Sequence, residues 1–144
     1  MIKTFRGKLA DGEQDTIRLS SNNGLRGYKI MKFEVMTGDT VGSIENASLV
    51  ALWKYEQDTV SGTVSFDDPN LLAAADYRQH DNEGYGITGT NIIFENEVFN
   101  QDIYITHKDL NLGASMNYYL ELEQMKLDLS EATVATLKDM RGSN

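Results

Sequence analysis

Met116-Asn-Tyr-Tyr-Leu-Glu-Leu-Glu-Gln-Met-Lys-Leu127 is the stretch that decides the fold class of this chain. Apolar and polar side chains alternate along it with a period of two, which places one set on each face of a β-strand. One set is Tyr118, Leu120 and Leu122, and the other is Tyr119, Glu121 and Glu123. After Glu123 the apolar positions shift to Met125 and Leu127, and this change of phase predicts a β-bulge.

Short segments of the same kind fill most of the chain. Twelve glycines and a single proline punctuate it, and the glycines lie in polar clusters between runs rich in Val, Ile, Tyr, Phe and Thr. Further strands are expected at Ile2–Leu9, Thr16–Ser20, Tyr28–Met36, Leu49–Tyr55, Val60–Phe66, Ile92–Phe99 and Ile103–His107. This rhythm predicts an all-β fold, an antiparallel β-sandwich of jelly-roll type that forms a single domain over residues 1–144.

Local signals refine this outline. Asp11-Gly12 readily takes the positive φ angles of a tight turn, so the first two strands are expected to form a β-hairpin. A phase change within Tyr28–Met36 predicts a bulge there, or burial of both faces of the strand. Leu49–Tyr55 carries apolar residues on both faces and is expected to be a central strand or one covered by a partner.

Three segments depart from the strand pattern. Leu71–Ala75 follows the proline and is expected to form one turn of helix or an edge strand. Gln79–Gly89 is polar and rich in glycine, and it is expected to be the longest exposed loop. A short helix is expected at about residues 130–141, with Asp128 and Glu131 in the spacing of a capping box.

Composition excludes several classes of function. The chain has 22 acidic and 13 basic residues, a formal charge of −9, and its basic residues are scattered, so binding to nucleic acid is not expected. It has no cysteine, which excludes disulfides and thiolate metal sites. The N-terminal residues contain no signal-peptide core and no apolar run is long enough for a membrane helix, so we expect a chain made without secretion and with no membrane partner.

Two motifs invite a functional interpretation that their context opposes. Gly84–Gly89 matches the glycine spacing of the dinucleotide fingerprint, but it is followed by an expected strand where that motif requires a helix. The pairs Glu95/Glu97 and Glu121/Glu123 have a spacing that places two carboxylates on one strand face, as in some glycosidases. Any strand face exposed to solvent produces the same spacing, and we interpret both pairs in that way.

The remaining candidate residues give no catalytic or metal-binding constellation. His80 and His107 have no metal-ligand spacing, and His80 is interpreted as a surface residue in an acidic loop. No serine or cysteine nucleophile motif is present. We therefore predict a protein that is not an enzyme, with no catalytic, cofactor-binding or metal-binding residues. Sugar stacking remains a hypothesis for the aromatic residues Tyr77, Tyr85, Trp53, Tyr118 and Tyr119.

Four stretches of the chain resemble small virion structural proteins of marine bacteriophages. They are Asn70–Ala75, Phe94–His107, Asn117–Glu123 and Ala132–Lys138. The resemblance implies a component of a phage particle that is made in the bacterial cytoplasm and assembled there. Within that class we expect a capsid decoration (cement) protein or minor capsid protein, with capsid or other virion proteins as partners and a homo-oligomeric state. A shell or vertex subunit is the nearest competitor, and a carbohydrate-binding sandwich of a host-recognition or tail device is the alternative from a different class.

Overall fold

A computed structural model describes residues 1–21, 23–39, 46–82, 85–111 and 113–141 of the chain. The side chains of residues 46, 80–82, 85–89 and 139–141 lie outside this description. The elements are β1 (Ile2–Leu9), β2 (Gln14–Ile17), β3 (Arg26–Thr37), β4 (Asn46–Trp53), β5 (Leu71–Asn82), β6 (Tyr85–Phe94), β7 (Ile103–Asp109), β8 (Met116–Lys126) and α1 (Leu129–Arg141).

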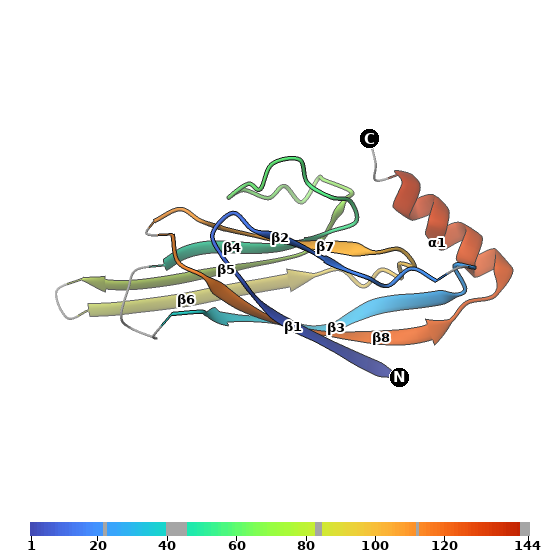
Figure 1. Cartoon of the computed structure of the whole chain (residues 1–144), viewed down its shortest axis with the longest axis horizontal. Helices are drawn as coiled ribbons and strands as arrows, with labels where there is room; N and C mark the ends of the chain where they lie inside the picture. The colour runs from blue at the N-terminus through green and yellow to red at the C-terminus, as the bar shows by residue number, and fades with distance from the viewer. Residues whose placement is uncertain (22, 40–45, 83–84, 112, 142–144) are drawn as a thin grey trace.

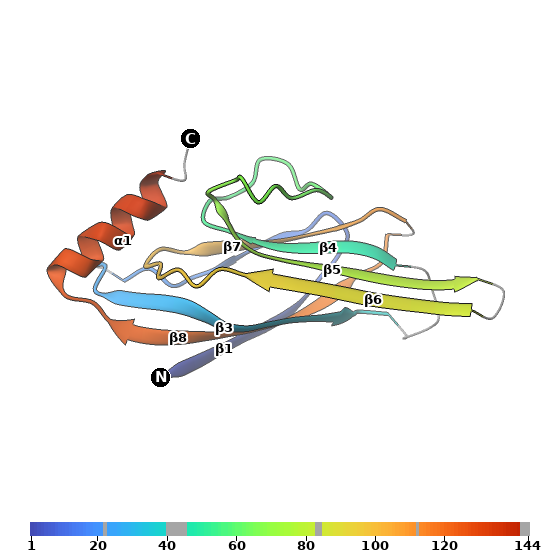
Figure 2. The same ribbon diagram turned by 180° about the vertical axis from the view of Figure 1, so that it is seen from behind.

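The strands form two sheets that pack face to face (Figures 1 and 2). One is a three-stranded sheet in the order β1-β8-β3, and the other is a five-stranded sheet in the order β2-β7-β4-β5-β6. All neighbouring strands are antiparallel. The predicted all-β sandwich with a C-terminal helix is therefore confirmed.

The strand pairing is nested from the ends of the chain inward. β1 pairs with β8, β2 with β7 and β4 with β5. The remaining pair is reduced to one antiparallel bridge between Tyr28 of β3 and Phe99, in the segment that follows β6. Pairing of this kind is a long hairpin rolled up on itself, which is the jelly-roll arrangement of a double sheet.

The main core lies between the two sheets. Alternate residues of β8 point into it, and Leu120 and Leu122 are completely buried. Phe33, Leu52 and Ile105 meet them from the other strands. The decisive alternation in the sequence was thus interpreted correctly, because one face of β8 is core and the other, with Glu121 and Glu123, is only half-buried.

Three further local predictions are confirmed. The register of β3 against β8 shifts between Ile30 and Lys32, which is the expected bulge. β4 lies between β7 and β5 and is an inner strand. Asp128 and Glu131 form a reciprocal capping box, with Glu131 N donating to Asp128 Oδ1 at 2.7 Å and Asp128 N donating to Glu131 Oε1 at 3.3 Å.

The expected N-terminal hairpin was wrong. A turn does occur at Asp11-Gly12, and Gly12 has a φ of 80°. However, β1 and β2 belong to different sheets, because the connection is bonded to β7 instead. Gly12 N donates to His107 O at 2.8 Å and His107 N donates to Glu13 O at 3.0 Å. The turn therefore moves the chain from one sheet to the other.

Strand predictions were wrong in three other places. Leu71–Ala75 begins the inner strand β5 and is neither helix nor edge strand, because its alanines let the chain pack between two neighbours. Val60–Phe66 is not a strand, and it lies in the segment across the outer side of the five-stranded sheet, where Val64 packs near Trp53. β6 ends at Phe94, so the expected strand Ile92–Phe99 is only partly formed.

The predicted bulge in β8 was also wrong, because β8 contributes no extra residue to either ladder. Its pairing with β1 is continuous, and its pairing with β3 runs without a shift from Glu123 to Lys126, the single register shift being caused by the extra residue Met31 of β3. Met125 and Leu127 are apolar for another reason, which is that they pack against Ala132 and Ala135 of α1. The change of phase in the sequence marks the end of the sheet where the helix docks.

The segment Gln79–Gly89 was predicted to be a loop, and this was wrong as well. β5 and β6 continue through it as a paired ribbon with His80 opposite Ile87 and Asn82 opposite Tyr85. The ribbon extends beyond the other strands at the end of the molecule opposite α1 (Figure 1). Antiparallel backbone pairing does not require an apolar face, so a polar sequence is compatible with this arrangement.

Candidate functional site

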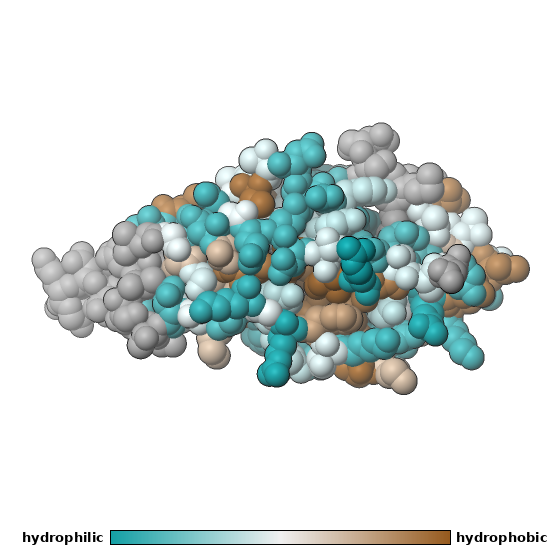
Figure 3. Space-filling model, viewed as in Figure 1, coloured by the Kyte–Doolittle hydropathy of each residue, from teal (hydrophilic) through white to brown (hydrophobic). Residues whose placement is uncertain are grey.

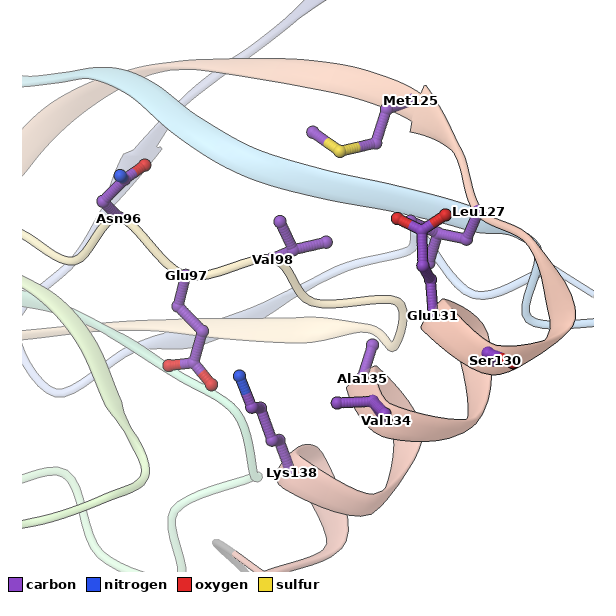
Figure 4. Close-up of a pocket in the computed structure, with 10 residues that line it drawn as sticks. All are labelled: Asn96, Glu97, Val98, Met125, Leu127, Ser130, Glu131, Val134, Ala135 and Lys138. Carbon is purple, nitrogen blue, oxygen red and sulfur yellow. The ribbon is translucent and has the colours of Figure 1, made fainter.

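The candidate site is a groove between helix α1 and the end of the sandwich (Figure 4). Its volume is about 580 Å³, within the range of about 300–1,000 Å³ that is typical of binding sites. Apolar side chains from three segments form its walls: Val98, Met125, Leu127, Val134 and Ala135. Polar side chains complete the lining: Asn96, Glu97, Ser130, Glu131 and Lys138.

The helix is held over this end of the sandwich by a small number of contacts. Ala132 and Ala135 face the body of the protein and are buried. The fully buried side chain of Asn100 places its Nδ2 group 2.9 Å from Thr136 Oγ1, 3.3 Å from Ala132 O and 3.0 Å from Gly24 O. Small residues on the buried side of the helix leave space between α1 and the sheet, and this space is the groove.

An ion pair lies at one end of the groove. Lys54 Nζ is 2.6 Å from Glu97 Oε1, and the Lys54 side chain is only 6% exposed. Lys138 points from α1 toward the Glu97 carboxylate (Figure 4). Because Glu97 already balances Lys54, Lys138 adds a positive charge and Glu131 a negative charge to the polar rim around the apolar walls of the groove.

Apolar side chains on α1 also face solvent. Leu129 is 76% exposed, Val134 51% and Leu137 50%. Leu129 and Leu137 border a smaller hollow of about 220 Å³ together with Thr133 and Thr136. Figure 3 shows apolar surface at the same end of the molecule. Exposed apolar residues that gather around one helix are typical of a surface that contacts another macromolecule.

A larger hollow of about 860 Å³ lies on the three-stranded sheet, lined by residues of β1, β3 and β8. Its lining combines the charged Arg6, Lys8 and Glu34 with Val35, Met36, Tyr118 and Tyr119, and further charged residues of the same sheet lie outside this lining. Lys29 Nζ is 3.5 Å from Glu123 Oε2, and Lys32 is paired across the strands with Glu121. Tyr119 has Lys32 Nζ 5.9 Å from its ring centroid. The groove beside α1 is the stronger candidate, because exposed apolar side chains of the helix lie next to it.

The structure separates the two predicted carboxylate pairs. Glu121 and Glu123 lie on one face of β8 opposite basic residues, as a solvated strand face requires. Glu95 and Glu97 follow the end of β6 and are not on a strand, so that part of the prediction was wrong. Glu97 is instead the partly exposed partner of the buried Lys54, a pairing across 43 positions that no local signal in the sequence reveals.

The glycine motif also has a different setting from the one expected. Gly84 lies outside the described residues, and Tyr85–Phe94 is strand β6. Residues 85–89 of the motif are therefore part of a β-strand that no helix follows directly, and the context that a pyrophosphate site needs is missing there.

Of the two histidines, the structure describes only the side chain of His107. The side chain of His80 lies outside the described residues. His107 is completely buried, and its Nδ1 lies 3.2 Å from Leu9 O and 3.1 Å from Ala10 O. Because both neighbours only accept, Nδ1 carries a proton and donates it, while Nε2 has no partner among the described groups. The ring joins the β1–β2 connection to β7 and has a structural role.

Most of the aromatic residues considered for sugar stacking are buried. Tyr77 is 6% exposed and donates its hydroxyl to Gln79 Oε1 at 2.9 Å. Trp53 is equally buried and donates its Nε1 to Thr106 Oγ1 at 2.9 Å. Tyr118 belongs to the main core. The expectation that Tyr77 is an exposed platform was wrong, and the side chain of Tyr85 lies outside the described residues.

Within the described residues, no group of three or more His, Cys, Asp or Glu side chains is placed to hold a metal ion. No helix there is long and apolar enough to cross a membrane. No protein-family model matches the chain, and no curated protein is similar to it in sequence.

Proposed function

We propose that this protein is a non-enzymatic structural component of a bacteriophage particle, a capsid decoration (cement) or minor capsid protein that stabilises the shell by protein–protein contacts. The observation that carries this proposal is the apolar groove beside α1, together with the half-exposed Val134 and Leu137 next to it. Such a surface serves binding, since stable contacts are built on apolar anchors surrounded by a polar rim.

The jelly-roll strand pairing supports the virion role by analogy of fold. Double-sheet jelly rolls are found in viral capsid proteins and in lectin domains. A fold hosts many functions, so this support is an association and the site has to carry the rest. It agrees with the resemblance of Phe94–His107 and Asn117–Glu123 to virion proteins. A shell or vertex subunit is the alternative within the same class.

The proposed occupant of the groove is a segment of a capsid protein with apolar side chains flanked by basic ones. The formal charge of −9 disfavours an acidic partner and attracts a basic surface. Glu131 stands at the groove rim and the Val134 side chain offers an apolar contact beside it. Many equal copies on a shell add modest contacts into stable attachment.

A binding experiment with purified capsids tests the proposal. Val134→Glu places a charge in the groove at a side chain that is already half-exposed, and we expect it to reduce co-sedimentation with capsids at least tenfold. Met36→Glu is the matched control, because Met36 is 63% exposed on the sheet far from α1, and it should bind like the wild type. Equal binding of both variants, or no binding by the wild type, contradicts the proposal.

The carbohydrate-binding alternative has lost three of its five aromatic residues as stacking platforms, since Tyr77, Trp53 and Tyr118 are buried. Its remaining support is the use of the jelly roll in lectins. Binding of the protein to a glycan panel, abolished by Tyr85→Ala, would favour it over the capsid role.

A further inference from the structure

The four strands at the sheet edges differ in how they are protected from pairing with another chain. Exposed edges of natural sheets carry charged residues, bulges or very short strands that prevent such pairing. β1 carries Lys3, Arg6 and Lys8, and β2 has only 4 residues. β3 has the bulge next to Lys32 and further charged residues. Each of these three edges therefore has a protective feature.

β6 is the remaining edge strand and has none of these features. Its 10 residues, Tyr-Gly-Ile-Thr-Gly-Thr-Asn-Ile-Ile-Phe, contain no charge and no proline. Its register against β5 is continuous from Tyr85 to Phe94, so it has no bulge. Ile93 is 49% exposed and Phe94 40%. β6 forms the margin of the five-stranded sheet in Figure 2.

The hydrogen bonds of the ladder show which backbone groups of β6 point away from β5. Glu95 N donates to the backbone carbonyl of Leu72 at 2.9 Å, and Asn91 N donates to the side-chain carboxylate of Asp76 at 2.9 Å, so the amide groups of both residues face β5. Antiparallel ladders alternate between inward and outward pairs. The outward residues, which offer N–H and C=O groups to a further strand, are Gly86, Thr88, Thr90, Ile92 and Phe94.

We propose that β6 pairs antiparallel with β6 of a second copy of this chain and joins two five-stranded sheets into one. Each copy carries a formal charge of −9, so two copies repel each other wherever charged residues meet. Because β6 has no charged residue, two copies can pair along it without placing like charges opposite each other.

The register of the pair follows from the outward groups. A two-fold axis at Thr90 pairs Gly86 with Phe94 and Thr88 with Ile92 of the second copy, so every outward residue of β6 finds an outward partner. Two threonines then face each other at the axis, a pairing that stabilises antiparallel strands. The inference names the surface of the homo-oligomer expected above and uses residues other than those of the α1 groove.

Mass measurement by light scattering tests the dimer directly. The wild type is expected at twice the chain mass of 16.1 kDa. Thr90→Lys places two ammonium groups opposite each other at the axis and should give a monomer, although it lowers the net negative charge of each copy. Thr4→Lys is the matched control, since Thr4 is exposed on the protected edge β1, and it should stay dimeric.

A cross-link tests the register independently. Opposed residues of a hydrogen-bonded antiparallel pair have Cα atoms about 5.5 Å apart, within the range of about 4.4–6.8 Å that a disulfide spans. The chain has no cysteine, so Thr90→Cys is expected to form a covalent dimer on mild oxidation, and Thr4→Cys is expected not to.

The inference is overturned by a monomeric wild type, by a Thr90→Lys variant that remains dimeric, or by a Thr90→Cys variant that cross-links no faster than Thr4→Cys. Protection of the Thr90 and Ile92 amides from hydrogen exchange only in the presence of capsids also overturns it, because the edge would then belong to a capsid strand. Capsid binding by Val134→Glu is measured separately, so failure of the dimer and failure of the virion role are distinguishable.

Discussion

Asp109 offers the sharpest test of how the sandwich is held together, because one buried carboxylate joins three segments. Asp109 is 4% exposed. Its Oδ1 accepts hydrogen bonds from Ala47 N at 2.9 Å and Ser48 Oγ at 3.3 Å, and its Oδ2 accepts from Ala114 N at 2.7 Å. It thereby ties the start of β4 and the segment before β8 to the end of β7.

The substitution Asp109→Asn keeps the shape and removes the charge. The side-chain NH2 group of the asparagine replaces one of the two acceptor oxygens. A buried backbone N–H, such as that of Ala114, then has no acceptor, which costs about 1–3 kcal/mol. The retained bonds lose charge assistance and weaken by roughly half. We therefore expect the free energy of unfolding, measured in urea at pH 7, to fall by about 2–4 kcal/mol. Asp58→Asn is the control, because it removes the same charge from an exposed position and should leave the stability almost unchanged.

The effect of Asp109→Asn depends on pH. Burial by itself raises the pKa of Asp109, but the hydrogen bonds from Ala114, Ala47 and Ser48 outweigh it and hold the pKa below its ordinary value of 3.8. A depressed pKa adds stability that is fully present above the ordinary value and is lost as the pH falls through the folded-state value. The difference between wild type and variant should shrink below pH 3.8. A loss under 0.5 kcal/mol at pH 7, or one independent of pH, would refute this account of Asp109.

Three further changes test the ion pair and the docking of α1. Glu97→Gln leaves the buried Lys54 ammonium without its counter-charge and should lower the free energy of unfolding by about 3 kcal/mol. Lys54→Met combined with Glu97→Gln should restore most of this loss, because no buried charge then remains unpaired. Equal urea midpoints of the single and the double variant would contradict this account of the ion pair. Asn100→Ala removes the contact to Thr136 and should speed amide hydrogen exchange in α1, while exchange in β8 stays slow. Equal acceleration in α1 and β8 would show that the helix does not open independently of the sheets. Asp128→Ala removes the N-terminal cap of α1 and should lower the free energy of unfolding by about 1 kcal/mol. An unchanged midpoint of thermal unfolding would argue against the capping box.

Features that depend on neighbouring residues were predictable from the sequence. The alternation in Met116–Glu123 gives the two faces of β8, and the spacing of Asp128 and Glu131 gives the start of α1. The phase change in β3 correctly indicates the bulge near Met31. In each case the physical cause lies within one turn or a few strand positions.

Features that depend on distant partners were not predictable in this way. The N-terminal strands look like a hairpin, yet Leu9 pairs with Met116 because the core is completed by the last strand of the chain. The shift to Met125 looks like a bulge but reflects docking of α1. The groove was missed for the same reason, since Val98, Met125 and Val134 come together only after the sheets and the helix have packed.

Mass spectrometry of bacteriophage particles, purified from a lysate in which this chain is produced, tests the proposed virion role most directly. A structural role in the virion predicts that the protein is present in a fixed, high copy number per particle and that it stays bound when the particles are purified twice by density gradient. Absence of the protein from intact particles, with the protein abundant in the infected-cell lysate, would contradict the claim.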